Sequence, residues 1–74
     1  MPRNEFKSTD WIQTEDGYKI TIQKEVPSNM SIIQVYKHET DGTAQTIVVQ
    51  TRDDEQSVTL EINRDPFDGY AVIK

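Results

Sequence analysis

Apolar and polar residues alternate most regularly in two segments of the chain. In residues 18–26 the apolar side chains share one face, formed by Tyr18, Ile20, Ile22 and Val26. Residues 57–63 repeat this pattern, with Val58, Leu60 and Ile62 on the inward face. A period of two is typical of β-strands with one face in the core and one in water. Both segments are therefore predicted to be half-buried strands.

Two further segments are rich in β-branched residues but alternate less clearly. Residues 30–39 favour a strand, with a short helix capped by Ser28 as the competing interpretation. Residues 43–52 are predicted to form one strand after a two-residue turn at Asp41-Gly42. That turn pairs Thr40 with Thr43 and sets Tyr36 opposite Ile47 and Val35 opposite Val48.

The remaining segments are shorter. A first strand is expected within residues 9–14 and a last one at 70–73. Asp53–Gln56 is predicted to be a turn with an even number of residues, which would place Val49 opposite Leu60. An odd number would send the apolar residues of one strand to the wrong face.

Three Asp-Gly pairs occur between these segments, at Asp16-Gly17, Asp41-Gly42 and Asp68-Gly69. Asp-Gly suits tight hairpin turns, because their central residues need positive φ. No link is long enough for a parallel crossover. The chain is therefore predicted to be all-β, an antiparallel meander of five or six strands forming a barrel or a two-layer sandwich. Residues 1–8 are expected to be a flexible arm, and residues 9–74 a single domain.

Composition narrows the classes of function. The chain has 74 residues, no cysteine and a net charge of −5. The negative charge disfavours direct binding to nucleic acids or to membrane surfaces, and the missing cysteines exclude disulfides and thiolate metal sites. Without an apolar leader or span in the sequence, the expected location is the cytoplasm, or a virion released from it.

A meander sends alternate turns to the same end of a sheet, so the three Asp-Gly turns should gather there. We call the expected cluster the acidic rim; its carboxylates are Glu15, Asp16, Glu39, Asp41, Asp65 and Asp68. The rim is a candidate contact surface for a basic protein partner. Two other interpretations are a weak hard-cation site and ordinary turn chemistry. No metal site is predicted, because the spacing of the carboxylates does not resemble an EF-hand loop.

Trp11 is the single tryptophan, and it has two interpretations. It is either a lid over the core or an interface hot spot, since tryptophan is enriched at interface centres. Together with Tyr70 it also suggests stacking on a sugar ring. His38, the single histidine, has no partner for a catalytic relay, and no serine lies in a nucleophile motif. We therefore expect neither an enzyme nor a cofactor.

The resulting hypothesis is a non-enzymatic module for protein–protein interaction or assembly, which contacts partners or copies of itself through the acidic rim and the Trp11 region. Short length, acidity and absence of cysteine are also typical of small proteins of phages and other mobile elements. Two alternatives remain: an acidic mimic of nucleic acid that inhibits a DNA- or RNA-binding protein, and a carbohydrate-binding module. Binding by a mimic would weaken steeply as salt rises.

Overall fold

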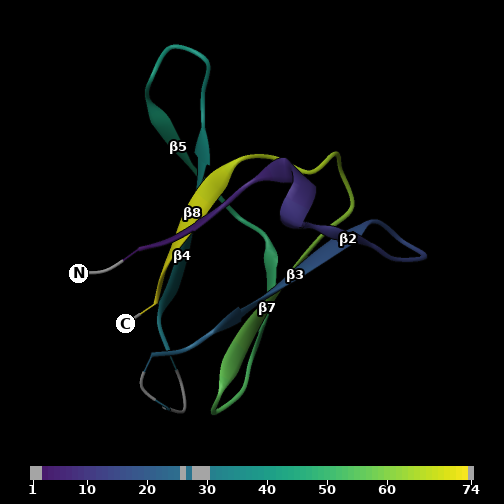
Figure 1. Cartoon of the computed structure of the whole chain (residues 1–74), viewed down its shortest axis with the longest axis vertical. Coiled ribbons are helices and arrows are strands. Elements are labelled where there is room, and N and C mark those ends of the chain that lie inside the picture. Colours follow the sequence, from purple (N-terminus) through teal and green to yellow (C-terminus); the bar gives the residue numbers. More distant parts are fainter. Residues whose placement is uncertain (1–2, 26, 28–30, 74) are drawn as a thin grey trace.

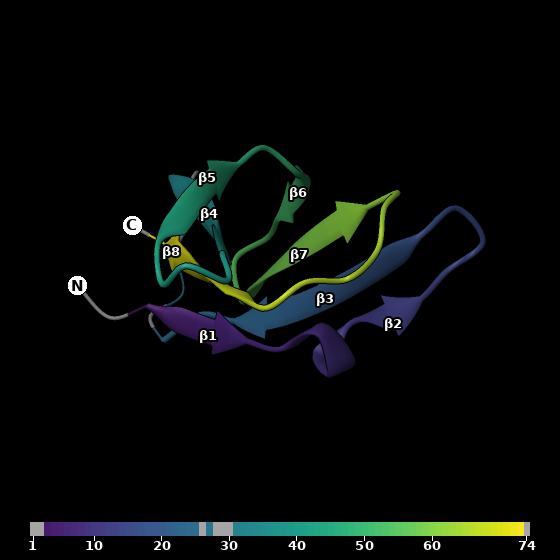
Figure 2. The same cartoon turned by 90° about the horizontal axis from the view of Figure 1, so that it is seen from above.

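The fold is built from two antiparallel sheets of four strands each (Figures 1 and 2). The computed structural model describes residues 3–25, 27 and 31–73. Within these residues there are eight strands and one 3-10 turn, η1: β1 (Asn4–Phe6), η1 (Ser8–Asp10), β2 (Ile12–Gln13), β3 (Tyr18–Gln23), β4 (Ile33–His38), β5 (Ala44–Ile47), β6 (Gln50–Asp53), β7 (Ser57–Ile62) and β8 (Gly69–Ile73). The first sheet has the order β1-β8-β4-β5 and the second β2-β3-β7-β6.

The all-β antiparallel prediction is confirmed, but the strand number and the simple meander are wrong. The described chain has eight strands instead of five or six, and they form two sheets without a closed barrel. Only β2–β3, β4–β5 and β6–β7 are pairs of neighbours along the chain. The links after β1, β3, β5 and β7 all cross from one sheet to the other.

The clearest alternating segments are strands, as predicted, and they lie side by side at the centre of the second sheet. β3 pairs with β7 over six residues, which sets Ile20 opposite Leu60 and Ile22 opposite Val58. All four side chains are buried, and the residues between them on β3 are exposed. The expected end of this strand at Val26 lies outside the described residues. β4 is also a strand, so the helical alternative is excluded over Ile33–His38.

The single strand expected over residues 43–52 is divided in two. β5 belongs to the first sheet and β6 to the second, with only Val48 and Val49 between them. Figure 2 shows the chain turning this corner. Val48 is 89% exposed at the bend. Strands that bend from one sheet into another are a common way to join the layers of a sandwich.

The turn between β4 and β5 has three residues instead of two. Glu39 N–H donates to the Thr43 carbonyl at 2.8 Å, and Gly42 N–H donates to the Glu39 carbonyl at 3.2 Å. Gly42 has a φ of +89°, as in hairpins that combine a turn with a glycine bulge. The extra residue shifts the predicted register by one, so Val35 lies opposite Ile47.

The turn between β6 and β7 keeps the predicted even count, although its register differs. Asp54 N–H donates to the Ser57 carbonyl at 3.0 Å, so two residues form the tip. Leu60 consequently lies opposite Thr51 instead of Val49. The shift is by two residues, and Leu60 keeps its place in the core.

Three aromatic side chains close the core where the two sheets meet. The ring centroid of Trp11 is 5.3 Å from that of Phe6 and 5.3 Å from that of Phe67. The Trp11 Nε1–H donates a hydrogen bond to the Phe67 carbonyl at 3.0 Å. Phe6 belongs to β1, which pairs with β8, so a strand lies at Asn4–Phe6 within the segment 1–8 that was expected to be an arm. The buried apolar core contains Phe6, Trp11, Ile20, Ile22, Val35, Val58, Leu60, Ile62, Phe67 and Ala71.

Candidate functional site

The structure does not bring the acidic rim together. Glu15 and Asp16 form the tip of the β2–β3 hairpin, and Asp41 lies at the tip of the β4–β5 hairpin. Figure 1 shows these two tips at different extremities, at the right and at the top. The physical reason is the topology, because the crossing links place the two hairpins in different sheets.

The other rim residues occupy local positions in the backbone. Asp68-Gly69 is not a hairpin turn, since Gly69 already begins β8. Asp68 Oδ1 accepts a hydrogen bond from Ser8 N–H at 2.7 Å and so fastens η1 to the β7–β8 link. Asp65 is exposed in the same link, and Glu39 flanks the β4–β5 turn.

Asp41 shows what turn chemistry does to a carboxylate. Its Oδ1 accepts hydrogen bonds from the Thr43 hydroxyl at 2.6 Å and from Thr43 N–H at 3.0 Å. These two bonds, the hydroxyl first, hold the pKa of Asp41 below its ordinary value. Asp41 therefore stabilises its own turn. This role agrees with the interpretation that the aspartates of the rim serve turn formation.

Trp11, the other residue expected to contact partners, is enclosed by the core. Only 6% of its surface is exposed, and its indole N–H is already bonded to Phe67. A buried indole cannot meet a partner or a sugar ring without a change in the fold. The position of Trp11 thus corresponds to the core interpretation.

A different cluster, made of aromatic and charged side chains, lies on the outer face of the first sheet. Val35 and Ala71 point into the core, so the neighbouring Tyr36 and Tyr70 point away from it. Strand pairing sets Tyr36 opposite Tyr70, and Tyr70 opposite Glu5 on β1. We call this surface the aromatic face and define it by Arg3, Glu5, Tyr36, His38 and Tyr70.

The aromatic face is ordered by contacts between its members. The rings of Tyr36 and Tyr70 are stacked, with centroids 4.7 Å apart and an interplanar angle of 21°. The Arg3 guanidinium lies 4.4 Å from the centre of the Tyr70 ring, within cation–π range. His38 lies 5.4 Å from Tyr70, and its Nε2 is 3.4 Å from both carboxylate oxygens of Glu5.

These contacts limit what the aromatic face can do. Tyr70 faces Tyr36 and Arg3, so a flat sugar would have to displace one of them to stack on it. The His38–Glu5 pair has no nucleophile among the contacts that the structure describes for it. What remains is a fixed surface of tyrosine, arginine and histidine, which suits contact with another macromolecule.

Local sequence patterns did not reveal the aromatic face. Tyr36 and Tyr70 come from segments that are distant in the chain, and they meet only because β4 pairs with β8. The available signal was weak: each tyrosine lies in an expected strand, next to one residue that the structure places in the core, Val35 for Tyr36 and Ala71 for Tyr70.

An open groove of about 610 Å³ lies at the other end of the molecule, beside the tip of the β2–β3 hairpin. Its lining includes Glu15, Asp16, Tyr18, Val49, Glu61 and Arg64. Glu61 is paired with Arg52 across β6 and β7. Within the described residues, no three histidine, aspartate or glutamate side chains are arranged to hold a metal ion.

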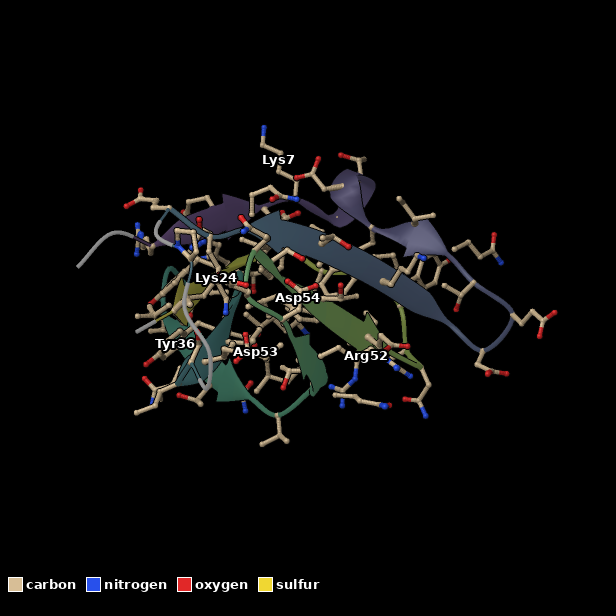
Figure 3. The ribbon with its side chains drawn as sticks, turned by 90° about the horizontal axis from the view of Figure 1, so that it is seen from below. Lys7, Lys24, Tyr36, Arg52, Asp53 and Asp54 are labelled. Atoms are coloured by element: carbon tan, nitrogen blue, oxygen red, sulfur yellow. The ribbon has the colours of Figure 1, made fainter. Side chains whose placement is uncertain are left out.

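Asp53 and Asp54, the first two residues of the acidic run 53–55, have a structural role. Lys24 Nζ lies 2.5 Å from Asp53 Oδ1 and donates to the Asp54 carbonyl, where the link after β3 passes the β6–β7 turn (Figure 3). Only 2% of the Lys24 side chain is exposed. Asp53 also accepts a hydrogen bond from Ser31 N–H at 2.8 Å. The bond from Lys24, and then that from Ser31, lower the pKa of Asp53.

None of the described residues forms a helix long and apolar enough to cross a membrane. Comparisons with models of protein families, with curated proteins and with solved structures give no match for this chain.

Proposed function

We propose that this protein is a non-enzymatic interaction and assembly module that contacts protein partners through the aromatic face. One observation carries the proposal: two stacked tyrosines stand on the outer face of a sheet, with Arg3 and His38 against Tyr70. Tyrosine and arginine are the side chains most enriched, with tryptophan, where interfaces derive their binding energy.

The order of the aromatic face favours this function. Stacking and the cation–π contact hold the side chains in place before a partner binds. A surface that is already ordered loses less conformational entropy on binding, so more of its contact energy appears as affinity. The hydroxyl of Tyr36, bonded to Gln34 Oε1 at 3.0 Å, adds a polar group at the same surface.

The two alternative functions draw less support from the structure. A nucleic-acid mimic needs its carboxylates gathered, and the hairpins that carry Glu15 and Asp41 have their tips at different extremities (Figure 1). A carbohydrate-binding module needs an open ring face, and Tyr70 is occupied by Tyr36 and Arg3. Protein contact needs neither condition.

The proposal is tested by capturing partners from the cells that produce the protein, with matched variants as bait. The test variant is Tyr36→Ala with Tyr70→Ala, a pair facing outward on neighbouring strands. Its control is Thr21→Ala with Thr59→Ala, a pair that is hydrogen bonded across β3 and β7 at 3.2 Å on the outer face of the second sheet.

We expect the tyrosine variant to retain about one tenth or less of each specific partner, because a hot-spot residue contributes about 2 kcal/mol or more. The threonine control should retain partners at the wild-type level. Circular dichroism of both variants checks that the sheets remain folded. Equal capture by both folded variants would show that the aromatic face is not the contact surface.

A further inference from the structure

The outer edge of the first sheet lacks the usual protection against strand addition. β5 is an edge strand, and its sequence, Ala44-Gln45-Thr46-Ile47, contains neither a charge nor a proline. Edge strands are normally protected by charged residues, proline or very short length. The other edges of the described sheets have such features: β1 carries Glu5, β6 carries Arg52 and Asp53, and β2 has two residues.

The hydrogen bonds of the neighbouring strand show which groups of β5 face this edge. His38 N–H donates to the Asp68 carbonyl at 2.9 Å, so His38 directs its backbone groups away from β5. Because His38 lies opposite Ala44, the Ala44 groups must point away from β4. The same alternation applies to Thr46. The N–H and C=O groups of Ala44 and Thr46 therefore face the free edge.

We propose that β5 pairs antiparallel with β5 of a second copy of this chain, joining the two first sheets into one continuous sheet. In the proposed register Gln45 lies on the twofold axis, opposite Gln45 of the copy. Ala44 then lies opposite Thr46 of the copy, and each such pair exchanges two N–H···O=C bonds. The proposal rests on the assembly function and names its partner as the protein itself.

This register matches the faces of the two sheets. Ala44 and Thr46 both lie on the outer face, since they are opposite His38 and Tyr36. A shift by one residue would pair outer with inner side chains. The outer row Glu5–Tyr70–Tyr36–Thr46 would then continue into Ala44 of the copy, so that the two aromatic faces form one surface.

Two further observations favour a second copy as the occupant. Val48, which directly follows β5 and is 89% exposed, would come near Gly42 of the copy, which lies two residues before Ala44. A side chain built on Gly42 would meet nothing within 4 Å, so this position has open space for Val48. In addition, the uncharged β5 brings no like charges into direct contact, although each chain carries a net charge of −5. The dimer should therefore form at physiological salt, where the remaining repulsion is screened.

The first test is the molar mass in solution, measured by light scattering from micromolar to millimolar concentration. The wild type should approach twice the chain mass of 8.6 kDa. Thr46→Pro removes an N–H that faces the free edge and should hold the protein at the monomer mass. Thr51→Pro is the matched control, because Thr51 faces the free edge of β6 by the same alternation, and it should leave the dimer intact. A wild type that stays monomeric at millimolar concentration would overturn the proposal.

The second test measures the register and does not depend on the proline variant. Gln45→Cys introduces a single thiol into a chain without cysteine. In the proposed register the two Gln45 residues form a non-hydrogen-bonded pair. The Cα atoms of such a pair are about 4.5 Å apart, which a disulfide can span, so oxidation should yield a disulfide-linked dimer. Thr51→Cys should stay largely unlinked under the same conditions. Equal linking of the two variants would contradict pairing at β5. Capture of partners through Tyr36 and Tyr70 is a separate measurement, so the dimer and the proposed function can fail independently.

Discussion

Lys24 shows how one charged residue can connect distant parts of a small domain. Its side chain is almost fully enclosed and contacts Asp53 and the Asp54 carbonyl beyond the β6–β7 turn. Enclosing an ammonium group is costly unless its charge is compensated. The Asp53 carboxylate supplies that compensation, and the Asp54 carbonyl accepts a further bond from the ammonium group. Two residues of a sequence that resembles an ordinary solvated turn therefore hold a side chain of the fold.

Acid should weaken the Lys24–Asp53 contact. The pKa of Asp53 is lowered in the fold by its bonds from Lys24 and Ser31, so this carboxylate stabilises the protein fully above its unfolded pKa of about 3.9. The contribution is lost as the pH falls through the lower folded pKa. We expect the melting temperature of the wild type to fall more between about pH 6 and pH 2 than that of Asp53→Asn. Parallel curves from calorimetry would contradict this assignment.

The three Asp-Gly pairs show why a dipeptide is an incomplete guide. Gly42 has the positive φ that a turn requires, and its surroundings are open. Gly69 lies inside the first sheet, where a Cβ would overlap the Tyr36 carbonyl oxygen, and Gly17 similarly approaches the Ile62 carbonyl. The sequence suggested that all three glycines are needed for turns. At two of the three positions, however, glycine is needed because another part of the backbone passes too close for a Cβ atom. Only the packed structure reveals that need.

Among the elements, the strands with strict alternation were predictable and the bent ones were not. β3 and β7 follow the period of two because each has one buried face. β5 and β6 lie in one segment that is rich in β-branched residues, and no residue type marks the corner at Val48. The register of β4 and β5 depends on a three-residue turn that Asp41-Gly42 alone does not distinguish from a two-residue one.

β1 lies in the segment that was expected to be a flexible arm, and Phe6 can test that expectation. Phe6 is 5% exposed and contacts Trp11 and Phe67. Phe6→Ala should lower the free energy of unfolding by about 3–5 kcal/mol. Ile12→Ala is the control, because Ile12 is 61% exposed, and its effect should stay within about 0.5 kcal/mol. Urea denaturation measures both, and equally small effects would indicate a loose arm at residues 1–8.

At the scale of the whole molecule, the pairings that decide the architecture join distant parts of the chain. β1 and β4 both pair with β8, and β3 pairs with β7. The hydrophobic period and the turn residues carry information about residues that are near each other in the chain. They therefore predicted strands and hairpins, but not the order of the strands in the sheets. The aromatic face depends on the same order. For that reason the sequence led to Trp11 and the acidic rim, and it considered Tyr70 only with Trp11 and not with Tyr36.

The two sheets should unfold as one unit, because both cover the same core. Trp11 reports on the junction through its contacts with Phe6 and Phe67, whereas far-ultraviolet circular dichroism reports on all strands. For one domain, the two signals should give the same urea midpoint. A Trp11 transition at a clearly lower urea concentration would show that the sheets unfold separately, so that residues 9–74 are not a single domain.

The same experiment at two protein concentrations connects stability with assembly. If folded chains pair through β5, mass action stabilises the dimer, and the urea midpoint should rise with protein concentration. The midpoint of Thr46→Pro should be independent of concentration, since its edge cannot donate the required bond, whereas Thr51→Pro should behave as the wild type. A midpoint that rises equally for Thr46→Pro would place self-association on another surface. The edge of one strand would then not determine the size of the assembly.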